Sequence, residues 1–333
     1  MGWAQRLRLQ ALLRCLAGLV FLLAALAVWR LVREHDLRDV GRALRAIAPA
    51  DIAAAALLAA GSYFVLTLFD WLGVRSAVGS DLAYRKIALA SLTATSLGHT
   101  VGFAALSGSV IRYRMYSRYG LGAADVARIV VFSGMTVAAG HAALAGAAGL
   151  SRPAAVADFA GIPTSLALLL GGGALLLLFL YLACAAAVPP EARAQGWRRL
   201  LPPLRVACLQ TAIGACNYLL VAGALKHLLG DAADVSLLSF ASFYVVGNTL
   251  AIASHVPGGL GVLELLVLSA VPEAEAVGAL IVFRLVYFVV PFAAGVILYC
   301  AAELARRAER APPESGPGLH HGRHHRDVVG SDR

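Results

Sequence analysis

The sequence predicts an all-α, polytopic membrane protein, and three observations lead to this fold class. The chain of 333 residues is 60% hydrophobic and 14% charged, whereas soluble globular domains carry about 25% charged residues. Its mean hydropathy is +0.77. Apolar runs of about 20 residues recur along the chain, and each is long enough to cross a hydrocarbon core of about 30 Å. These observations exclude a soluble domain.

The basic charge fits the same class. In a membrane protein, a net charge of +9 indicates cytoplasmic loops and contact with anionic lipid, not nucleic-acid binding. Lys86 and Lys226 are the only lysines, and the many arginines and alanines favour a GC-rich bacterial genome and a bacterial cytoplasmic (inner) membrane. We expect no cofactor and no metal site. The five cysteines form no CxxC motif and are expected to pack as small apolar residues.

Eight hydrophobic segments are expected, of which about six span the membrane as helices and two are broken. The spanning helices are predicted over residues 15–29, 51–69, 125–150, 164–188, 206–229 and 276–300. Most of the 28 lysines and arginines fall on the cytoplasmic side when both termini are cytoplasmic, as the positive-inside rule requires. Residues 1–303 then form one membrane domain and residues 304–333 a disordered tail.

Two short segments between these spans are not expected to cross the membrane. Residues 33–49 resemble an amphipathic helix at the outer interface, although their arginines argue against that side. Residues 151–163 contain prolines and are expected to be an outer loop.

The first broken stretch, residues 91–120, gives the chain its most informative pattern. Small residues and three glycines interrupt it, and a cluster of arginines and tyrosines follows. One interpretation is a re-entrant hairpin that ends in a basic cradle for an anionic headgroup. The other is a spanning helix with a basic cytoplasmic flank. The helix-breaking glycines are Gly98, Gly102 and Gly108, and the cradle residues are Arg112, Arg114, Arg118, Tyr113 and Tyr116.

The second broken stretch, residues 248–268, enters from the opposite side. A proline removes a backbone donor and neighbouring glycines permit a sharp reversal, so a helix must break here. Either both broken stretches re-enter or both span, and charge alone does not decide between six and eight crossings. The break residues are Pro257, Gly258, Gly259 and Gly261, and the polar residues beside them are Asn248, His255 and Glu264.

The two stretches share a faint repeat. Thr93, His99 and Gly102 have the same spacing as Thr249, His255 and Gly258. Two similar broken segments that enter from opposite sides are expected of inverted-repeat transporters with a site near the bilayer midplane.

Asp70, Glu264 and Arg284 are ionisable residues within or at the edge of the bilayer, which makes them functional candidates. Asp70 either is solvated at the headgroup level or faces the interior and pairs with an arginine of the cluster. Arg284 is expected to pair with Glu264 or Asp70, either as a switch that lipid competes with or as a purely structural pair. His99 and His255 are structural histidines or members of a proton relay.

RYRMYSRYGL after the GFAALSGS run, together with HVPGGLGVLE, resembles the two signature stretches of a known family. This is the transmembrane flippase region of the lysylphosphatidylglycerol synthase/flippase (multiple peptide resistance factor) family, and the similarity covers approximately residues 10–305. The resemblance implies a region that moves aminoacylated phosphatidylglycerol between leaflets. In the full-length family a separate cytosolic domain transfers the amino acid from aminoacyl-tRNA. The present chain ends soon after its last expected span, so the resemblance implies a stand-alone member without the transferase.

The expected partner is therefore an anionic or aminoacylated phospholipid, whose phosphate suits the forked donors of arginine. Lipid transport by a flippase is the first function. The alternative is a non-transporting membrane partner of a separate lipid-modifying enzyme. An enzyme acting on lipid is a third, but the sequence contains no HExxH motif, no paired carboxylates and no nucleotide-binding loop. Its oligomeric state, a homo-oligomer included, stays open.

Overall fold

The computed structural model describes residues 47–101, 104–189, 201–230, 236–254 and 273–310, together with Arg45 and Val267. Within these residues every regular element is helical, and five helical segments are long and apolar enough to cross a membrane. The predicted class, an all-α polytopic membrane protein, is confirmed. The expected span over residues 15–29 and most of the amphipathic segment 33–49 lie outside the described residues.

The candidate spans follow the predicted apolar runs closely. Three are single helices, and the first and the last are each continuous with a π-helical turn. They are α3 (Pro49–Gly73), α6 (Ala123–Ser151), α8 (Thr164–Ala187), α9 (Leu204–Leu229) and the run of α12 (Glu273–Arg284), η7 (Leu285–Val289) and α13 (Val290–Arg310). Proline suits the first position of α3 because its missing N–H would have no intrahelical partner there. After α3 the π-helical η1 (Val74–Val78) ends at Gly79, whose φ of 74° favours glycine.

The first broken stretch forms a helical hairpin. Its arms are α4 (Tyr84–Val101) and α5 (Ala104–Tyr116), which pack against each other. The 13 residues of α5 extend about 20 Å at 1.5 Å per residue, which is too short for a hydrocarbon core of about 30 Å. The chain therefore returns to the end from which it entered. The short η2 (Ser117–Tyr119) follows and ends at Gly120.

Two of the predicted helix breaks in this hairpin are wrong. Gly98 lies within α4 and Gly108 lies within α5. A helix tolerates an internal glycine at a cost of about 1 kcal/mol relative to alanine, so glycine alone does not end it. The first arm ends at Val101 and the second begins at Ala104, and residues 102–103 lie outside the described set.

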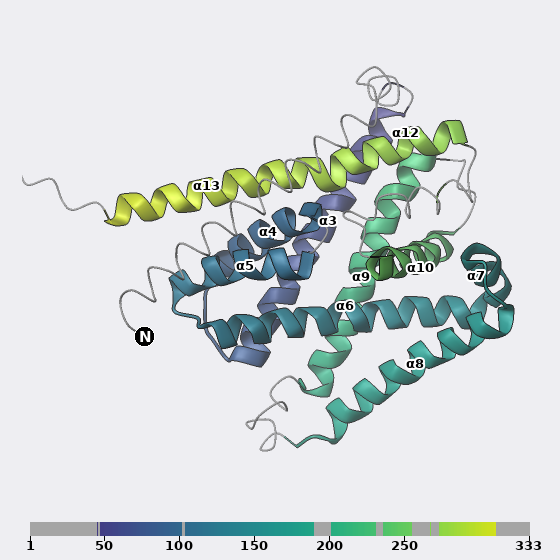
Figure 1. Ribbon diagram of the computed structural model, residues 1–333, viewed down its shortest axis with the longest axis horizontal. Helices are drawn as coiled ribbons and strands as arrows, with labels where there is room; N and C mark the ends of the chain where they lie inside the picture. The colour runs from purple at the N-terminus through teal and green to yellow at the C-terminus, as the bar shows by residue number, and fades with distance from the viewer. Residues whose placement is uncertain are drawn as a thin grey trace, which may run out of the picture.

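The hairpin lies between α6 on one side and α13 on the other (Figure 1). An apolar core holds its two arms together: Ile87, Ala90 and Leu97 of α4 join Ile111 and Met115 of α5 in one cluster. The polar ends of α4 and α5 are thereby brought to the end of the bundle where α3 stops and α6 begins.

Three other segments differ from or extend the sequence predictions. The expected loop 151–163 contains α7 (Pro153–Ala160), because its proline occupies the first helical position and Val156 and Ala157 are buried. The apolar α10 (Leu237–Ser254) precedes the second predicted break, which lies outside the described residues. Helix α13 continues to Arg310, seven residues beyond the predicted membrane domain.

Glycines set the closest helix crossings. A Cβ atom on Gly140 of α6 would lie 2.6 Å from the Cα of Gly214 in α9, and one on Gly149 would lie 2.7 Å from the Cα of Gly171 in α8. Small residues at such crossings allow membrane helices to approach closely. Of the three glycines in α8, Gly171 forms such a crossing, whereas a Cβ on Gly172 or Gly173 would meet nothing within 4 Å. Helix α8 otherwise exposes large side chains such as Leu169 and Leu177, as a lipid-facing helix would.

Candidate functional site

A buried carboxylate, that of Asp70 in the last turn of α3, lies at the centre of a polar cluster. Its side chain has no exposed surface. The Nε of Arg112 donates to both carboxylate oxygens, at 2.9 and 3.2 Å. The Tyr116 hydroxyl donates to Oδ2 and the Ser133 hydroxyl to Oδ1, each at 3.1 Å. A buried charge is tolerated where it is paired and hydrogen-bonded, and Asp70 meets both conditions.

The guanidinium of Arg112 is also held from the other arm of the hairpin. Its Nη2 donates to Oγ1 of Thr95 in α4 at 3.2 Å. Gly108 lies one turn earlier on α5, and a Cβ there would be 3.1 Å from Nη1 of Arg112. The absence of a side chain at Gly108 therefore leaves room for the guanidinium. About one seventh of the Arg112 side chain, 14%, stays exposed.

The other two arginines of the cluster bind a different carboxylate. Arg118 donates from Nη2 to Oε2 of Glu303 at 2.6 Å, and Nη2 of Arg114 lies 3.3 Å from Oε1. Arg118 also donates from Nη1 to the carbonyl oxygen of Ala302 at 3.2 Å. The guanidinium of Arg114 lies 5.4 Å from the centre of the Tyr299 ring. These contacts join the end of α5 and η2 to α13.

The predicted basic cradle is thus divided into two ion-paired groups at one end of the bundle. Three arginines face two carboxylates, which leaves one net positive charge. Tyr116 is fully buried against Asp70, and Tyr113 is half-buried in the apolar core of the hairpin. In the first turn of α4, Arg85 and Lys86 are exposed and add positive charge at this end.

A second polar cluster lies deeper among the helices. Ser62 of α3 donates to Oδ1 of Asn217 in α9 at 2.7 Å and lies 3.0 Å from the hydroxyl of Tyr287 in η7. The Tyr63 hydroxyl donates to the carbonyl oxygen of Tyr287 at 3.1 Å. The His99 ring stacks near Tyr287, with 6.5 Å between ring centres. The predicted histidine is therefore packed against aromatic rings near the tip of the hairpin.

The remaining predicted residues are dispersed or undescribed. Asn248 lies 3.5 Å from the Tyr218 hydroxyl, and Thr249 one residue later contacts His141. Arg284 is buried at the end of α12, directly before the π-helical η7. The ionic partner that the structure gives to Asp70 is Arg112. The predicted residues that fall outside the described set are Gly102, His255, Pro257, Gly258, Gly259, Gly261 and Glu264.

Several residues of the site were not found from the sequence. Ser133 and Thr95 are small polar residues in apolar runs, where their common occurrence gives no signal. Glu303 was assigned to the boundary with the tail. It is the first charged residue after the apolar part of its helix, and that position was the available clue. Gln210 is fully buried in a spanning helix, and such a residue needs partners.

Comparison with known proteins agrees with this architecture. The sequence profile of the family described as "Lysylphosphatidylglycerol synthase TM region" matches residues 15–295. The chain is 25% identical over 301 residues to uncharacterized protein slr0712 of Synechocystis sp., an alignment that covers 89% of this chain and 93% of the relative. It is also 25% identical over 308 residues to inner membrane protein YbhN of Escherichia coli, covering 91% and 96%. A profile match over most of the chain, on a multi-pass helical fold, identifies the protein as a member of the lysylphosphatidylglycerol synthase transmembrane-region family.

Proposed function

We propose that this protein binds and translocates an anionic or aminoacylated phospholipid, such as phosphatidylglycerol or its lysyl ester. We place it in the bacterial inner membrane with both termini cytoplasmic, which puts the arginines of the hairpin on the cytoplasmic side, as the positive-inside rule favours. The observation that carries the proposal is the buried ion pair of Asp70 and Arg112, at the end of a hairpin that stops short of crossing.

A phosphate can replace a carboxylate as the partner of an arginine. Both are anions with oxygens that accept forked hydrogen bonds from a guanidinium. The side chains of Arg112, Arg114 and Arg118 are each 13–18% exposed, so a headgroup reaches their edges. The excess of one positive charge in this group favours an anion over a neutral headgroup.

Exchange of partners gives the site two arrangements. In the arrangement that the structure shows, Asp70 pairs with Arg112 and Glu303 pairs with Arg114 and Arg118. A bound phosphate competes for the arginines and weakens the contacts that tie α5 to α3 and α13. Movement of the hairpin relative to these helices then follows from headgroup binding, because a ligand shifts an equilibrium toward the state that it binds better.

Leaflet exchange in proteoliposomes tests the proposal. Fluorescent phosphatidylglycerol and its lysyl ester are incorporated, and a membrane-impermeant quencher reports the fraction in each leaflet. We expect wild-type protein to accelerate exchange, and we expect Arg112→Ala and Glu264→Gln to abolish that acceleration. Arg75→Ala is the matched control, because Arg75 lies at the same end but pairs with the exposed Asp81. Well-folded wild type that exchanges neither lipid would overturn the proposal.

That negative result would favour the second candidate, a membrane protein that binds a separate lipid-modifying enzyme. The observation behind it is the exposed pair Arg85 and Lys86 beside the ion-paired arginines, since exposed charges suit a transient protein contact. We do not propose a catalytic activity for the chain itself. The relation to a lysylphosphatidylglycerol synthase is through its membrane region.

A further inference from the structure

An apolar groove lies at the opposite end of the bundle from Arg112. It has a volume of about 440 Å³ and is lined by α3, α9 and the start of α10, and this volume is within the ~300–1,000 Å³ of small-molecule sites. Helices α3 and α9 run antiparallel, since Ser62 contacts Asn217 while Asp51 lies near His227. Leu58 in the groove is therefore about 18 Å along α3 from Asp70.

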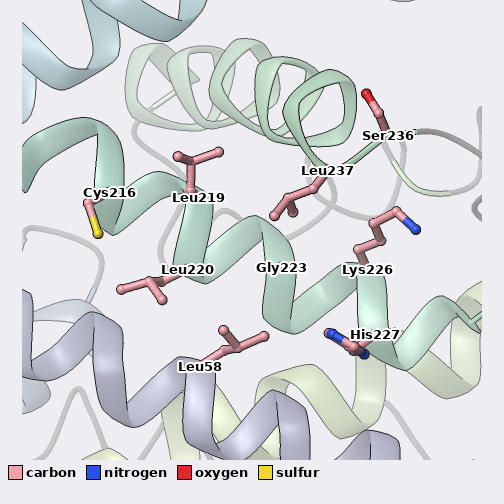
Figure 2. Close-up of a pocket in the computed structure, with 9 residues that line it drawn as sticks. All are labelled: Leu58, Cys216, Leu219, Leu220, Gly223, Lys226, His227, Ser236 and Leu237. Carbon is pink, nitrogen blue, oxygen red and sulfur yellow. The ribbon is translucent and has the colours of Figure 1, made fainter. Parts of the chain in front are cut away.

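The groove has an apolar body and a cationic end. Figure 2 shows Cys216 at one end, four leucines along the middle, and Lys226 with His227 at the other end. The leucines are Leu58, Leu219, Leu220 and Leu237. Such a lining excludes a polar solute from the body and leaves charged donors only at one end. This division matches an amphiphile that has a hydrocarbon chain and an anionic head.

The charges at the cationic end favour an anion. The Nδ1 of His227 lies 3.8 Å from Oδ1 of Asp51, which is an ion pair when the imidazole is protonated, and Asp51 itself does not line the groove. Within the described residues Lys226 forms no ion pair. Lysine near the end of a spanning helix places its apolar stem along the groove and its ammonium at the headgroup level.

Gly223 forms the floor of the groove. A Cβ at this position would lie 3.4 Å from Cδ1 of Leu58 and 3.6 Å from Cδ1 of Leu237, which is ordinary contact. Alanine therefore fits here, whereas leucine would extend into the space between the two leucines. The chain thus offers a substitution that blocks the groove and a matched one that does not.

From these observations we infer a second lipid-binding site, in which one acyl chain lies among the groove leucines and an anionic headgroup binds Lys226. Under the proposed function this site serves the leaflet opposite to the Asp70–Arg112 site. The inference extends that function, but binding at the groove does not require translocation. The two sites are tested separately.

A probe within the groove reports binding there and not elsewhere. In a protein whose only cysteine is Cys216, a bimane fluorophore is attached, and the protein is reconstituted in phosphatidylcholine. Phosphatidylglycerol or phosphatidylcholine with a doxyl group on one acyl chain is then titrated as quencher. We expect saturable quenching, with half-quenching at about a fivefold lower fraction of phosphatidylglycerol, the preference expected of one lysine near an anionic headgroup. The same fluorophore on Cys208, which does not line the groove, is the position control.

The variants separate the headgroup from the acyl chain. Lys226→Gln should remove the preference for phosphatidylglycerol and keep saturable quenching by both lipids. Gly223→Leu should remove the saturable component, and Gly223→Ala should retain it. The inference would be overturned if the otherwise unsubstituted protein showed equal quenching by both lipids or no quenching at all. A preference for phosphatidylglycerol that survives both Lys226→Gln and Gly223→Leu would also overturn it.

Failure of the groove as a lipid site can be distinguished from failure of the proposed translocation function. Arg112→Ala should leave quenching at Cys216 unchanged, because Arg112 belongs to the other end of the bundle. Loss of the preference for phosphatidylglycerol in Lys226→Gln together with absent leaflet exchange in wild type would retain the groove as a lipid site and reject translocation. Leaflet exchange without any quenching at Cys216 would reject the groove and retain translocation.

Discussion

The Nε of Arg112 lies 2.9 Å from Oδ2 of Asp70, and this contact ties the re-entrant hairpin to the first described span. The two residues are 42 positions apart in the chain. Because Asp70 has no exposed surface, water cannot replace Arg112 as the partner of this carboxylate. The stability of the hairpin and its proposed response to lipid therefore depend on the same pair.

The first prediction separates those two roles. Asp70→Asn and Arg112→Gln should each lower stability by about 3–5 kcal/mol, because each leaves a buried charge without its partner. The double variant should recover most of that loss, since no unpaired charge remains. It should not recover leaflet exchange if Arg112 binds the headgroup. Unfolding in detergent and proteoliposome exchange are the measurements. Recovery of both together would mean that the pair is structural only.

The second prediction concerns Glu303, which joins α13 to Arg114 and Arg118. Glu303→Gln removes the charge that both guanidinium groups share, and a hydrogen bond to a charged group contributes about 1.5–3 kcal/mol. We expect a lower melting temperature and faster hydrogen exchange in η2. The control is Asp81→Asn, because Asp81 is an exposed partner of Arg75 and such pairs contribute little. Equal effects of the two substitutions would contradict the assignment of Glu303 as the shared ionic partner of Arg114 and Arg118.

The third prediction concerns the crossing of α6 and α9. A side chain at Gly140 would meet the backbone of Gly214, so Gly140→Ala must separate the helices. Overpacking of this kind costs about 1–3 kcal/mol, which should appear as a lower melting temperature. Gly134→Ala on the same helix meets nothing within 4 Å and should be neutral or slightly stabilising. A tolerated Gly140→Ala would show that the crossing is looser than described.

The fourth prediction concerns Gln210, which links three spans. Its Oε1 accepts from the Tyr181 hydroxyl at 2.6 Å, and its Nε2 donates to Oγ1 of Thr136 at 2.8 Å. Gln210→Leu leaves the Tyr181 hydroxyl without this acceptor, at a cost of about 1–3 kcal/mol. Thr211→Ala is the neighbouring control, because the Thr211 hydroxyl donates to the carbonyl oxygen of Ala207 in its own helix. In thermal unfolding, we expect a clearly lower melting temperature for Gln210→Leu than for Thr211→Ala.

Much of the fold could be predicted from local sequence. The apolar run over residues 164–188 gave α8 (Thr164–Ala187) almost residue for residue, because the length of a spanning helix is set by the bilayer. The hairpin interpretation of residues 91–120 was also right in outline. Its glycines were misjudged, because a glycine that ends a helix and one that gives room to an arginine look alike in sequence. Only the position of Arg112 beside Gly108 distinguishes them.

The sequence predicted part of the candidate site. Pairing of Asp70 with an arginine of the cluster was one of its two alternatives, and the structure bears it out; Thr95, Ser133 and Glu303 were not found. The sequence identified Asp70 and Arg112 as candidates, since ionisable residues in a membrane are costly. It could not show that Arg118 pairs with Glu303, which is 185 positions away.

By itself, then, the sequence determined that the protein is an all-α membrane protein with a broken, arginine-rich hairpin, because hydrophobic length and helix-breaking residues act within one segment. The tertiary structure alone decided which carboxylate neutralises which arginine and where Gly140 meets Gly214. It also placed the groove between α3, α9 and α10. Ion pairs and cavities exist only between side chains that packing brings together, and no single segment contains that information.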